Sequence, residues 1–519
     1  MLVRDYLMRN EAVWPERIAY VSETARLSWG DVAARSRRLA AALQGLGIGK
    51  GDVVASMSFD SHEVVELWYA CSLIGAVRVG INPRYSAGEV QHLLSDSGAR
   101  VLIVEGGDCE QTFDRLESTV ADLVVIGFGS HQRGRDYEQT LSDHSGEPVL
   151  PELNDDDIIA LSYTTGTTGL PKGALWRQAG VIESLVKSWF QTGARPDDVF
   201  LHCLPAAGVP VLWMTRNLVN GSRVVIQRKF SAPAALDLIA SERITTVGWV
   251  PTMVLDILSE LDAMARDISS LRLVVYGTAP ATPALVRQAT EALGCEMQQW
   301  YGSTEGTLGC YAILSWEDHQ KALSGQPEIL TSSGRPTLHC EVRILDDDLR
   351  PVLRGQTGNI CVRGATLMAG YHNRPEETAA ALREGWLVTG DLGMLDQQGY
   401  LRIVDRKNFM IITGSYNVYP VVVENVLADH ESVHEVCVFG IPDERWGEAV
   451  CAVVVPHGDN TDRDGLRADL IALARTRLAK FEVPKRIDFA DALPRGTTGK
   501  LLKRVVRDKY WATDAIATG

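Results

Sequence analysis

The segment LSYTTGTTGLPKGALW (residues 161–176) carries the strongest indication of both fold and chemistry. Threonines and glycines follow a strand-like run and precede a segment that we expect to be helical. Such residues let successive backbone N–H groups and hydroxyls converge on an anion, and a lysine adds positive charge. The predicted phosphate ligands are Thr164, Thr165, Gly166, Thr167, Thr168 and Lys172. The segment is not a Walker loop, because Pro171 stands where that motif requires glycine. The alternative is a glycine-rich surface linker.

Helical and strand patterns alternate on both sides of this loop. Residues 27–48 have apolar side chains at helical spacing, whereas residues 52–59 and 99–106 are short β-branched runs. The alternation recurs over residues 180–300, which predicts an α/β fold of parallel sheets with covering helices.

The pattern of predicted helices and strands changes twice beyond residue 300. Residues 335–404 form short strand-like runs separated by Gly and Asp turns, which indicates a β-rich subdomain. A compact α+β pattern follows. We therefore predict a large N-terminal domain over residues 1–404 and a small C-terminal domain over residues 405–519.

The composition restricts the partners and the compartment. The 519 residues include 51 Lys and Arg against 66 Asp and Glu, a net charge of −15, which argues against nucleic acid as a partner. Nine cysteines occur singly and without a C-x-x-C pair, as in a reducing compartment. The most apolar stretch, residues 67–81, is interrupted by Arg78 and is too short to span a bilayer. We predict a cytoplasmic protein without a membrane span.

Two further segments contain candidate ligands of a nucleotide. In QQWYGSTEGTLG (residues 298–309), Tyr301 can stack on a purine, Thr304 can donate to a phosphate, and Glu305 is the type of oxygen ligand that Mg²⁺ uses. In GWLVTGDLG (residues 385–393), Asp391 can accept from both hydroxyls of a ribose. Each residue taken alone could equally be structural, and Asp391 could be a turn former.

Together these segments resemble the acyl-adenylate-forming superfamily, which contains acyl-CoA synthetases, aryl-CoA ligases, luciferases and adenylation domains. The resemblance covers nearly the whole chain. It rests on YTTGTTGLPKG, YGSTEG, TGD, DRKNFMIITGSYNVYP and LPRGTTGKLLKR, in the order that the family has them. It implies two α/β subdomains, a β-barrel-like subdomain and a small mobile C-terminal domain, with ATP and Mg²⁺ as ligands.

The resemblance also assigns roles to single residues. It implies that Tyr301 flanks adenine, that Asp391 and Arg406 hold the ribose, and that Glu305 binds Mg²⁺. Further nucleotide ligands are implied at the end of LRLVVYGTAP (residues 271–280), namely Gly277, Thr278 and Ala279, and in residues 298–309, namely Gly302 and Thr304. Lys500, in RGTTGK, is the implied catalytic lysine, which would bridge the incoming oxyanion and the α-phosphate. Thr304, as a phosphate ligand, and Glu305, as the Mg²⁺ ligand, are the other implied catalytic residues. Asn408 occupies the implied hinge.

Two departures from the family pattern affect the substrate. Relatives that form thioesters carry a second glycine after the hinge, whereas this chain has Gly414 followed by Ser415, so the CoA tunnel is either narrowed or slightly shifted. Relatives also have an aromatic residue and a histidine that follow a proline and gate the acyl site, whereas here Ala206, Ala207 and Gly208 follow Pro205. The implied acyl site comprises Pro205, Ala206, Ala207, Gly208, Trp249, Val250, Thr307 and Leu308. Trp249 could equally anchor the core.

The leading hypothesis is an enzyme that adenylates a carboxylic acid with ATP and then transfers the acyl group to CoA. The alternative is a CoA-independent relative, such as a diazotase that activates nitrite for an aryl amine. Oxidation of the adenylate is a third possibility, and a non-catalytic scaffold is a fourth. The sequence decides neither the acid nor the oligomeric state.

Overall fold

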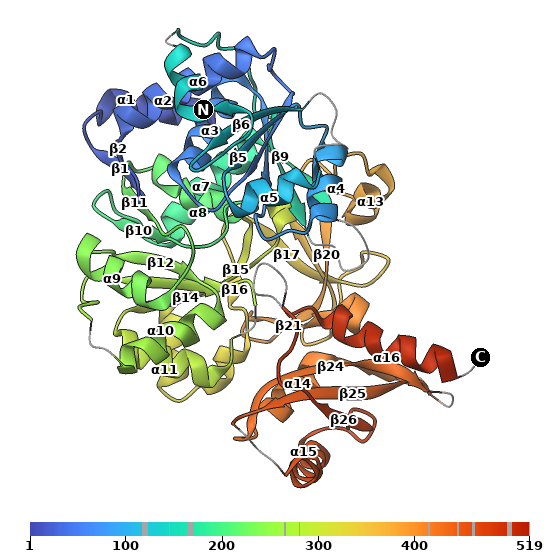
Figure 1. Cartoon of the computed structure of the whole chain (residues 1–519). Coiled ribbons are helices and arrows are strands. Elements are labelled where there is room, and N and C mark those ends of the chain that lie inside the picture. Colours follow the sequence, from blue (N-terminus) through green and yellow to red (C-terminus); the bar gives the residue numbers. More distant parts are fainter. Residues whose placement is uncertain are drawn as a thin grey trace. The chain divides into compact units, whose positions relative to one another are not determined.

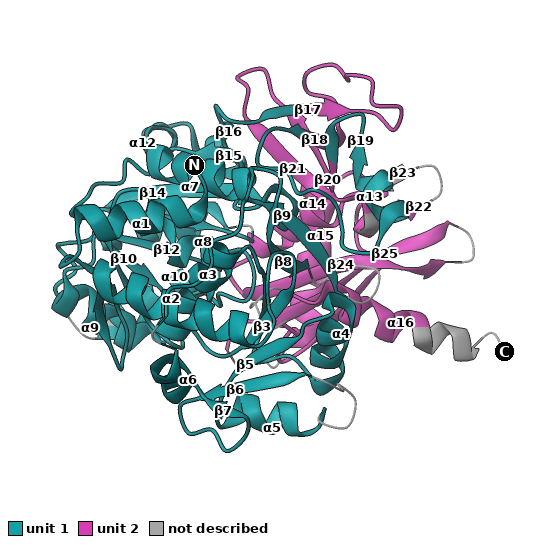
Figure 2. Cartoon of the chain, turned by 90° about the horizontal axis from the view of Figure 1, so that it is seen from above, with its two compact units in different colours: residues 1–342, 362–387 teal, residues 343–361, 388–519 magenta. Residues whose placement is uncertain are grey.

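The computed structural model describes residues 1–116, 123–144, 146–164, 171–263, 266–279, 281–413, 416–443, 446–458, 462–495 and 501–517. The chain divides into two compact units, residues 1–342 with 362–387 and residues 343–361 with 388–519 (Figure 2). The predicted mixed α/β fold is confirmed. The domain boundary expected near residue 405 remains a prediction.

The first sheet of unit 1 has the strand order β7-β6-β5-β3-β4-β8-β9 and is parallel except for the pair β8 and β9. Its strands are β3 (Val53–Met57), β4 (Val77–Ile81), β5 (Val101–Glu105), β6 (Val124–Phe128), β7 (Arg135–Asp136), β8 (Ile158–Thr164) and β9 (Lys172–Arg177). The accompanying helices are α2 (Trp29–Gly45), α3 (His62–Ile74), α4 (Ala87–Ser97), α5 (Asp108–Asp114), α6 (Tyr137–Asp143) and α7 (Gln178–Gln191). Helices α2, α3 and α6 lie on one side of this sheet, and α4 and α5 lie on the other (Figure 1).

Strands β3, β4 and β5 of this sheet are buried on both faces, which explains why nearly continuous apolar runs form them. Ala55 and Met57 of β3 and Val79 of β4 pack with residues of α4 and α5 in one apolar core. Helix α4 begins at a capping box, because the Ser86 side chain accepts from the Glu89 amide. The strands predicted over residues 52–59 and 99–106 are thus confirmed as β3 and β5.

The second sheet of unit 1 has the order β16-β15-β14-β13-β12-β10-β11-β1-β2. Its strands are β1 (Ile18–Val21), β2 (Arg26–Ser28), β10 (Val199–His202), β11 (Arg223–Ile226), β12 (Thr246–Trp249), β13 (Leu273–Gly277), β14 (Glu296–Gly302), β15 (Cys310–Leu314) and β16 (Arg335–Pro336). The helical segments that go with it are α1 (Val3–Val13), α8 (Pro210–Met214), η1 (Arg216–Leu218), α9 (Ala232–Glu242), α10 (Pro251–Ala263), α11 (Pro283–Leu293), η2 (Thr304–Gly306), α12 (Trp316–Leu323) and η3 (Pro327–Thr331). Strands β10 to β14 run parallel, so their carboxyl ends lie along one edge.

A third sheet, β17-β18-β20-β19 with β21 beside β20, contains residues of both units. Its elements are β17 (Glu341–Leu345), β18 (Gly358–Arg363), α13 (Pro375–Ala381), β19 (Leu382–Arg383), β20 (Trp386–Leu395) and β21 (Leu401–Arg406). This is the β-rich region that the Gly and Asp turns predicted.

The remainder of unit 2 is built on the sheet β23-β22-β25-β24, with β26 beside β25. Its elements are η4 (Lys407–Phe409), β22 (Ile411–Thr413), β23 (Tyr416–Val418), α14 (Pro420–Ala428), β24 (Val433–Asp443), β25 (Gly447–Pro456), α15 (Arg463–Arg477), β26 (Arg486–Phe489) and α16 (Lys503–Ala517). Residues of α14 and α15 share one apolar cluster with this sheet, and Val506 of α16 belongs to a second cluster with alternate residues of β24 and β25.

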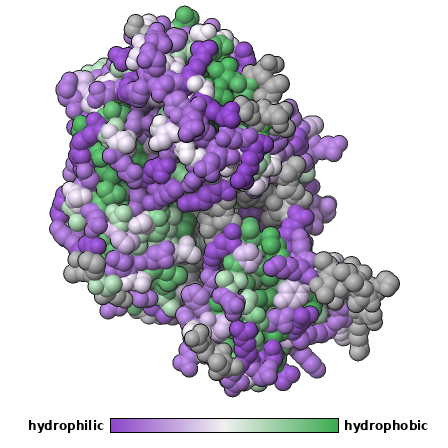
Figure 3. All heavy atoms as spheres, viewed as in Figure 1, coloured by the Kyte–Doolittle hydropathy of each residue, from purple (hydrophilic) through white to green (hydrophobic). Residues whose placement is uncertain are grey.

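Hydrophilic residues predominate on the face of unit 1 seen in Figure 3, as the charge balance leads one to expect. Within the part of the chain that the structure describes, each helix is too short or too polar to cross a membrane.

Candidate active site

The phosphate-loop segment joins two paired strands. Thr164 ends β8 and lies directly opposite Lys172, the first residue of β9. The expectation of a helix after the loop was wrong, because residues 172–177 form an antiparallel strand with β8 instead. The other predicted ligands of this loop, residues 165–168, lie outside the described residues.

A short network connects Lys172 with the predicted magnesium ligand. The ammonium group of Lys172 pairs with Glu377 of α13 and lies 5.5 Å from the centroid of the Tyr371 ring. The Tyr371 hydroxyl donates to Glu305 Oε1 over 2.7 Å. Three segments distant in sequence therefore meet here, and a positive charge, a phenol and a carboxylate lie in one row. Sequence reasoning missed Tyr371, because nothing in its local sequence marks it.

The Thr304–Gly306 turn that holds Glu305 is fixed through its backbone. The Met368 amide donates to the Glu305 carbonyl oxygen over 2.7 Å, and Trp176 Nε1 donates to the Thr304 carbonyl oxygen over 2.9 Å. These bonds occupy main-chain carbonyls. They leave the partly exposed Thr304 and Glu305 side chains on a turn of defined conformation.

Only glycine fits at position 302, where β14 meets this turn. A Cβ atom there would lie 1.5 Å from the Gly309 carbonyl oxygen. Two residues beyond the turn's Glu305, Thr307 is fully buried with φ 65° and ψ −114°, an unusual conformation for a β-branched residue. Its hydroxyl donates to the Thr366 carbonyl oxygen over 2.6 Å, which helps to hold it there. Leu308 is buried beside it.

The residues predicted to contact adenine lie at the carboxyl ends of neighbouring parallel strands. Gly277 ends β13 opposite Trp300 of β14, and a Cβ atom on Gly277 would lie 2.3 Å from the Trp300 carbonyl oxygen. Thr278 follows with φ 66° and is exposed, and Ala279 is partly exposed. Tyr301 packs edge-to-face on Tyr311, with ring centroids 5.7 Å apart. The carboxyl edge of parallel strands is where α/β folds bind ligands.

Unit 2 brings together the two residues predicted to hold the ribose. Asp391 of β20 is the direct antiparallel partner of Arg406 at the end of β21. Arg406 Nε lies 3.0 Å from Asp391 Oδ1, and the side chains are 51% and 9% exposed. The Asp391 amide donates to Thr389 Oγ1 over 3.2 Å. The guanidinium thus fixes one side of a carboxylate that is an acceptor for hydroxyl groups.

The predicted hinge follows directly. Asn408 is the middle residue of η4, and Asp405, at the end of β21, is buried and accepts from the Val421 amide over 3.1 Å. Burial raises the pKa of Asp405. The other hinge-side candidates of unit 2, Gly414, Ser415 and Lys500, lie outside the described residues.

A lysine whose side chain is only 11% exposed stands three residues after Lys500, and its local sequence did not mark it. Lys503 begins α16, and its Nζ atom lies 2.8 Å from Glu424 Oε1. Burial by itself would lower the pKa of Lys503, but the carboxylates of Glu424 and Asp405 more than offset this and raise it. The start of α16 is therefore tied to the segment around the hinge through a charged cluster within unit 2.

The implied acyl site is small and tightly held where the structure describes it. The Ala206 amide donates to Asp60 Oδ1 over 2.8 Å, and Arg78 Nη2 donates to the Ala206 carbonyl oxygen over 2.9 Å. Trp249 is 2% exposed at the end of β12, and Val250 is buried after it. Pro205, Ala207 and Gly208 are partly exposed. Sequence reasoning did not connect Arg78 with this site.

The chain was compared with known families and proteins. The family model described as AMP-binding enzyme matches residues 7–372, and the model described as AMP-binding enzyme C-terminal domain matches residues 422–500. Feruloyl-CoA synthase from an Amycolatopsis species is 36% identical over 516 residues, which cover 97% of this chain and 100% of that protein. Indoleacetate–CoA ligase from Aromatoleum aromaticum is 35% identical and covers 98% of both chains.

Solved structures with the same fold include two functional branches. The amide bond synthetase McbA from Marinactinospora thermotolerans has a TM-score of 0.88 at 32% identity, over 98% of this chain and 100% of that chain. The o-succinylbenzoate CoA synthetase MenE from Bacillus subtilis, solved with its acyl-adenylate, has a TM-score of 0.85 at 30% identity, over 97% and 98%. With both family matches in chain order and relatives similar over their full lengths, this chain belongs to the AMP-binding enzyme family of AMP-forming ligases.

Proposed function

We propose that the chain adenylates a carboxylic acid with ATP, releases pyrophosphate and transfers the acyl group to the thiol of CoA. The observation that carries this proposal is the row formed by Lys172, Tyr371 and Glu305 in unit 1. A predicted phosphate-binding cation and a predicted magnesium-binding carboxylate lie beside the same phenol. Relatives named for feruloyl-CoA and indoleacetate–CoA formation support the same reaction type.

In the proposed adenylation, the carboxylate of the acid attacks the α-phosphorus of ATP in line, and pyrophosphate leaves. Both reactants are negatively charged, so the chain must supply positive charge where they meet. Lys172 would neutralise phosphate oxygens from unit 1, which requires it to leave or share its pairing with Glu377. Lys500 would bridge the attacking oxygen and the α-phosphate.

The described side chains fit a magnesium ion that arrives with the nucleotide. Among these residues there is no group of three or more His, Cys, Asp or Glu that could enclose a metal. Mg²⁺ in nucleotide sites is commonly held by one or two carboxylates together with phosphate oxygens, and Glu305 can serve as such a carboxylate. The ion would supply charge neutralisation at the phosphates.

We propose the remaining nucleotide contacts for each unit separately. The carboxyl edge of β13 and β14 offers Gly277, Thr278 and Tyr301 for the adenine. Asp391, oriented by Arg406, would accept from the ribose hydroxyls. Asn408 would be the hinge residue at which the C-terminal domain changes its orientation between the two half-reactions. The boundary near residue 405 and a cytoplasmic location belong to the same proposal.

A CoA-independent acceptor is the second candidate. It is favoured by the similarity to the amide bond synthetase McbA, which matches this chain over 98% of its length. In that case an amine would attack the acyl-adenylate and AMP would leave. The nitrite and aryl amine route belongs to the same CoA-independent class, and the named relatives offer no parallel for it.

The test is to incubate the full chain with ATP, Mg²⁺ and a panel of aryl, arylacrylic and medium-chain acids, and to measure AMP and acyl products. Thioester formed only when CoA is added supports the leading proposal. Amide formed with an amine and without CoA supports the second candidate. AMP release that requires nitrite and no organic acid would replace both.

A further inference from the structure

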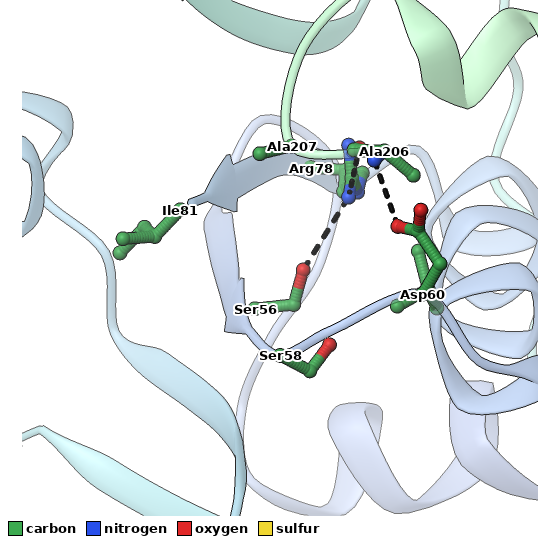
Figure 4. Close-up of a pocket in the computed structure, with 8 residues that line it drawn as sticks. Ser56, Ser58, Asp60, Arg78, Ile81, Ala206 and Ala207 are labelled. Carbon is green, nitrogen blue, oxygen red and sulfur yellow. Dashed lines mark hydrogen bonds between the residues drawn. The ribbon is translucent and has the colours of Figure 1, made fainter. Parts of the chain in front are cut away.

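A small pocket in unit 1 lies where β3 and β4 approach the loop after β10 (Figure 4). Its lining residues are Ser56, Ser58, Asp60, Val64, Arg78, Ile81, Ala206 and Ala207. The free space accommodates about one water molecule. Because Ala206 and Ala207 belong to the implied acyl site, the pocket adjoins that site.

Arg78 is the only cationic side chain in this lining, and it is buried with 3% exposure. Its Nη2 atom donates to the Ala206 carbonyl oxygen over 2.9 Å and approaches Ser56 Oγ at 3.5 Å (Figure 4). Its Nε atom is enclosed and has no hydrogen-bond partner among the described residues. Burial lowers the pKa of Arg78 to about 10, so the guanidinium is still charged at neutral pH.

No carboxylate of the described residues forms an ion pair with Arg78. The nearest candidate, Asp60, also lines the pocket but is otherwise engaged. Its Oδ1 atom accepts from the Ala206 amide. Its Oδ2 atom lies 3.3 Å from His202 Nε2, an atom that forms no hydrogen bond among the described residues. The Asp60 charge acts on Arg78 only through space and raises its pKa in part against the effect of burial. Buried charges in proteins are ordinarily paired. Arg78 thus combines a buried charge, an enclosed donor and adjacent free space.

A second buried arginine in unit 1, Arg216, serves as a comparison, because aromatic rings lie next to its guanidinium. Arg216 also has its pKa lowered to about 10 by burial, and one of its Nη atoms lacks a partner among the described residues. However, its guanidinium lies 4.6 Å from the Phe200 ring centroid and 5.6 Å from that of Trp213, and it donates to Thr192 Oγ1 over 2.8 Å. Aromatic faces compensate a cation. No such ring contacts Arg78 in the described chain.

We propose that the Arg78 pocket binds a small planar oxyanion, a carboxylate-type pair of oxygens, as part of the substrate site. Arg78 would supply the charge, and the hydroxyls of Ser56 and Ser58 would supply further donors. One oxygen of the anion occupies the water-sized space. Sulfate could also place one oxygen there, but its remaining oxygens form a bulkier tetrahedral group, so we expect sulfate to bind less tightly than a planar anion. This inference rests on the proposed function, because it places the pocket in the acid-binding region.

The planar oxyanion can come from two sources. One is a second carboxylate on the organic acid, and the other is a free small oxyanion such as nitrite. In the first case Arg78 selects dicarboxylic over monocarboxylic acids. In the second it holds an inorganic anion in the acid-binding region.

The experiment measures binding by calorimetry of the full chain to benzoate, to its dicarboxylic analogues, to nitrite and to sulfate, followed by acid-dependent pyrophosphate exchange. The variants are Arg78→Met, Arg78→Lys and Ser58→Ala, with Arg216→Met as the matched loss of a buried arginine. Arg78→Met should weaken binding of a dicarboxylic acid or of nitrite by roughly 10- to 100-fold, the scale of a charged hydrogen bond. Arg78→Lys should fall between it and the parent, and Arg216→Met should keep the parent's preference among anions.

Tighter binding of the dicarboxylic acids than of benzoate identifies a second carboxylate of the substrate as the ligand. Binding of nitrite identifies a free oxyanion as the ligand. Equal affinity for all probes in the parent and in Arg78→Met, or an equal loss in Arg216→Met, would overturn the inference. Binding of sulfate as strong as that of the planar anions would also overturn it. If exchange proceeds with monocarboxylic acids while Arg78 has no effect, only this inference fails. If no acid supports exchange, the proposed function fails, while calorimetry still tests the pocket.

Discussion

Replacement of Tyr371 by phenylalanine removes a single hydroxyl next to the proposed magnesium ligand. That hydroxyl donates to Glu305 Oε1 over 2.7 Å, so the variant loses one hydrogen bond to a charged acceptor. Such bonds contribute about 1.5–3 kcal/mol. Because Glu305 is partly exposed and water can replace the donor, we expect the lower end, about 1.5 kcal/mol or roughly tenfold. The phenyl ring, beside which Lys172 lies, is retained.

The assay is the rate of acid-dependent pyrophosphate exchange over a range of Mg²⁺ concentrations. Tyr371→Phe should raise the Mg²⁺ concentration at half-maximal rate about tenfold, because the carboxylate is less well oriented. Tyr311→Phe is the matched control, since that hydroxyl bonds to Ser303 Oγ over 2.8 Å. An unchanged Mg²⁺ dependence in Tyr371→Phe, or the same shift in Tyr311→Phe, would refute the reasoning.

Three further variants test separate parts of the molecule. Lys500→Ala should slow pyrophosphate exchange by roughly 10²- to 10³-fold, as for loss of one oxyanion donor, and exchange at the parent rate would remove Lys500 from the mechanism. Lys503→Met leaves the 18% exposed Glu424 carboxylate without its cation and should lower the free energy of unfolding by about 1.5–3 kcal/mol in urea titrations; adding Glu424→Gln should recover part of this, and no recovery would contradict the pairing. Gly302→Ala places a Cβ atom 1.5 Å from a backbone oxygen and should cost roughly 1–3 kcal/mol and most of the exchange activity. The control Gly88→Ala, which has open space, should change stability by under about 1 kcal/mol, and equal effects would show that the crowding at 302 is relieved.

Local sequence patterns were sufficient to predict several helices and strands, and also one pair of residues that lie next to each other in the fold. Short β-branched runs predicted β3 and β5, helical spacing predicted α2, and the order of the motifs predicted the family. Asp391 and Arg406 were expected to act together, and they face each other across two antiparallel strands. Where the sequence analysis erred, as in the helix expected after the phosphate loop, strand pairing decided instead. Residues 172–177 satisfy their backbone groups against β8.

The residues that the sequence analysis missed act through distant contacts. Tyr371 reaches Glu305 across 66 positions, and Arg78 reaches Ala206 across 128. Neither lies in a motif, and Arg78 served only as an interruption of an apolar run. Lys503 looked like one basic residue among several, because burial and carboxylate neighbours are properties of the folded unit. Such groups become visible only once the strands that carry them are paired.

The most direct test of the account is the fate of the phosphates of ATP. Radiolabelled pyrophosphate should exchange into ATP in the presence of Mg²⁺ and a suitable carboxylic acid, and AMP should be the nucleotide product. ADP and inorganic phosphate as the products, or failure of every acid to support exchange, would contradict the central claim that attack occurs at the α-phosphorus.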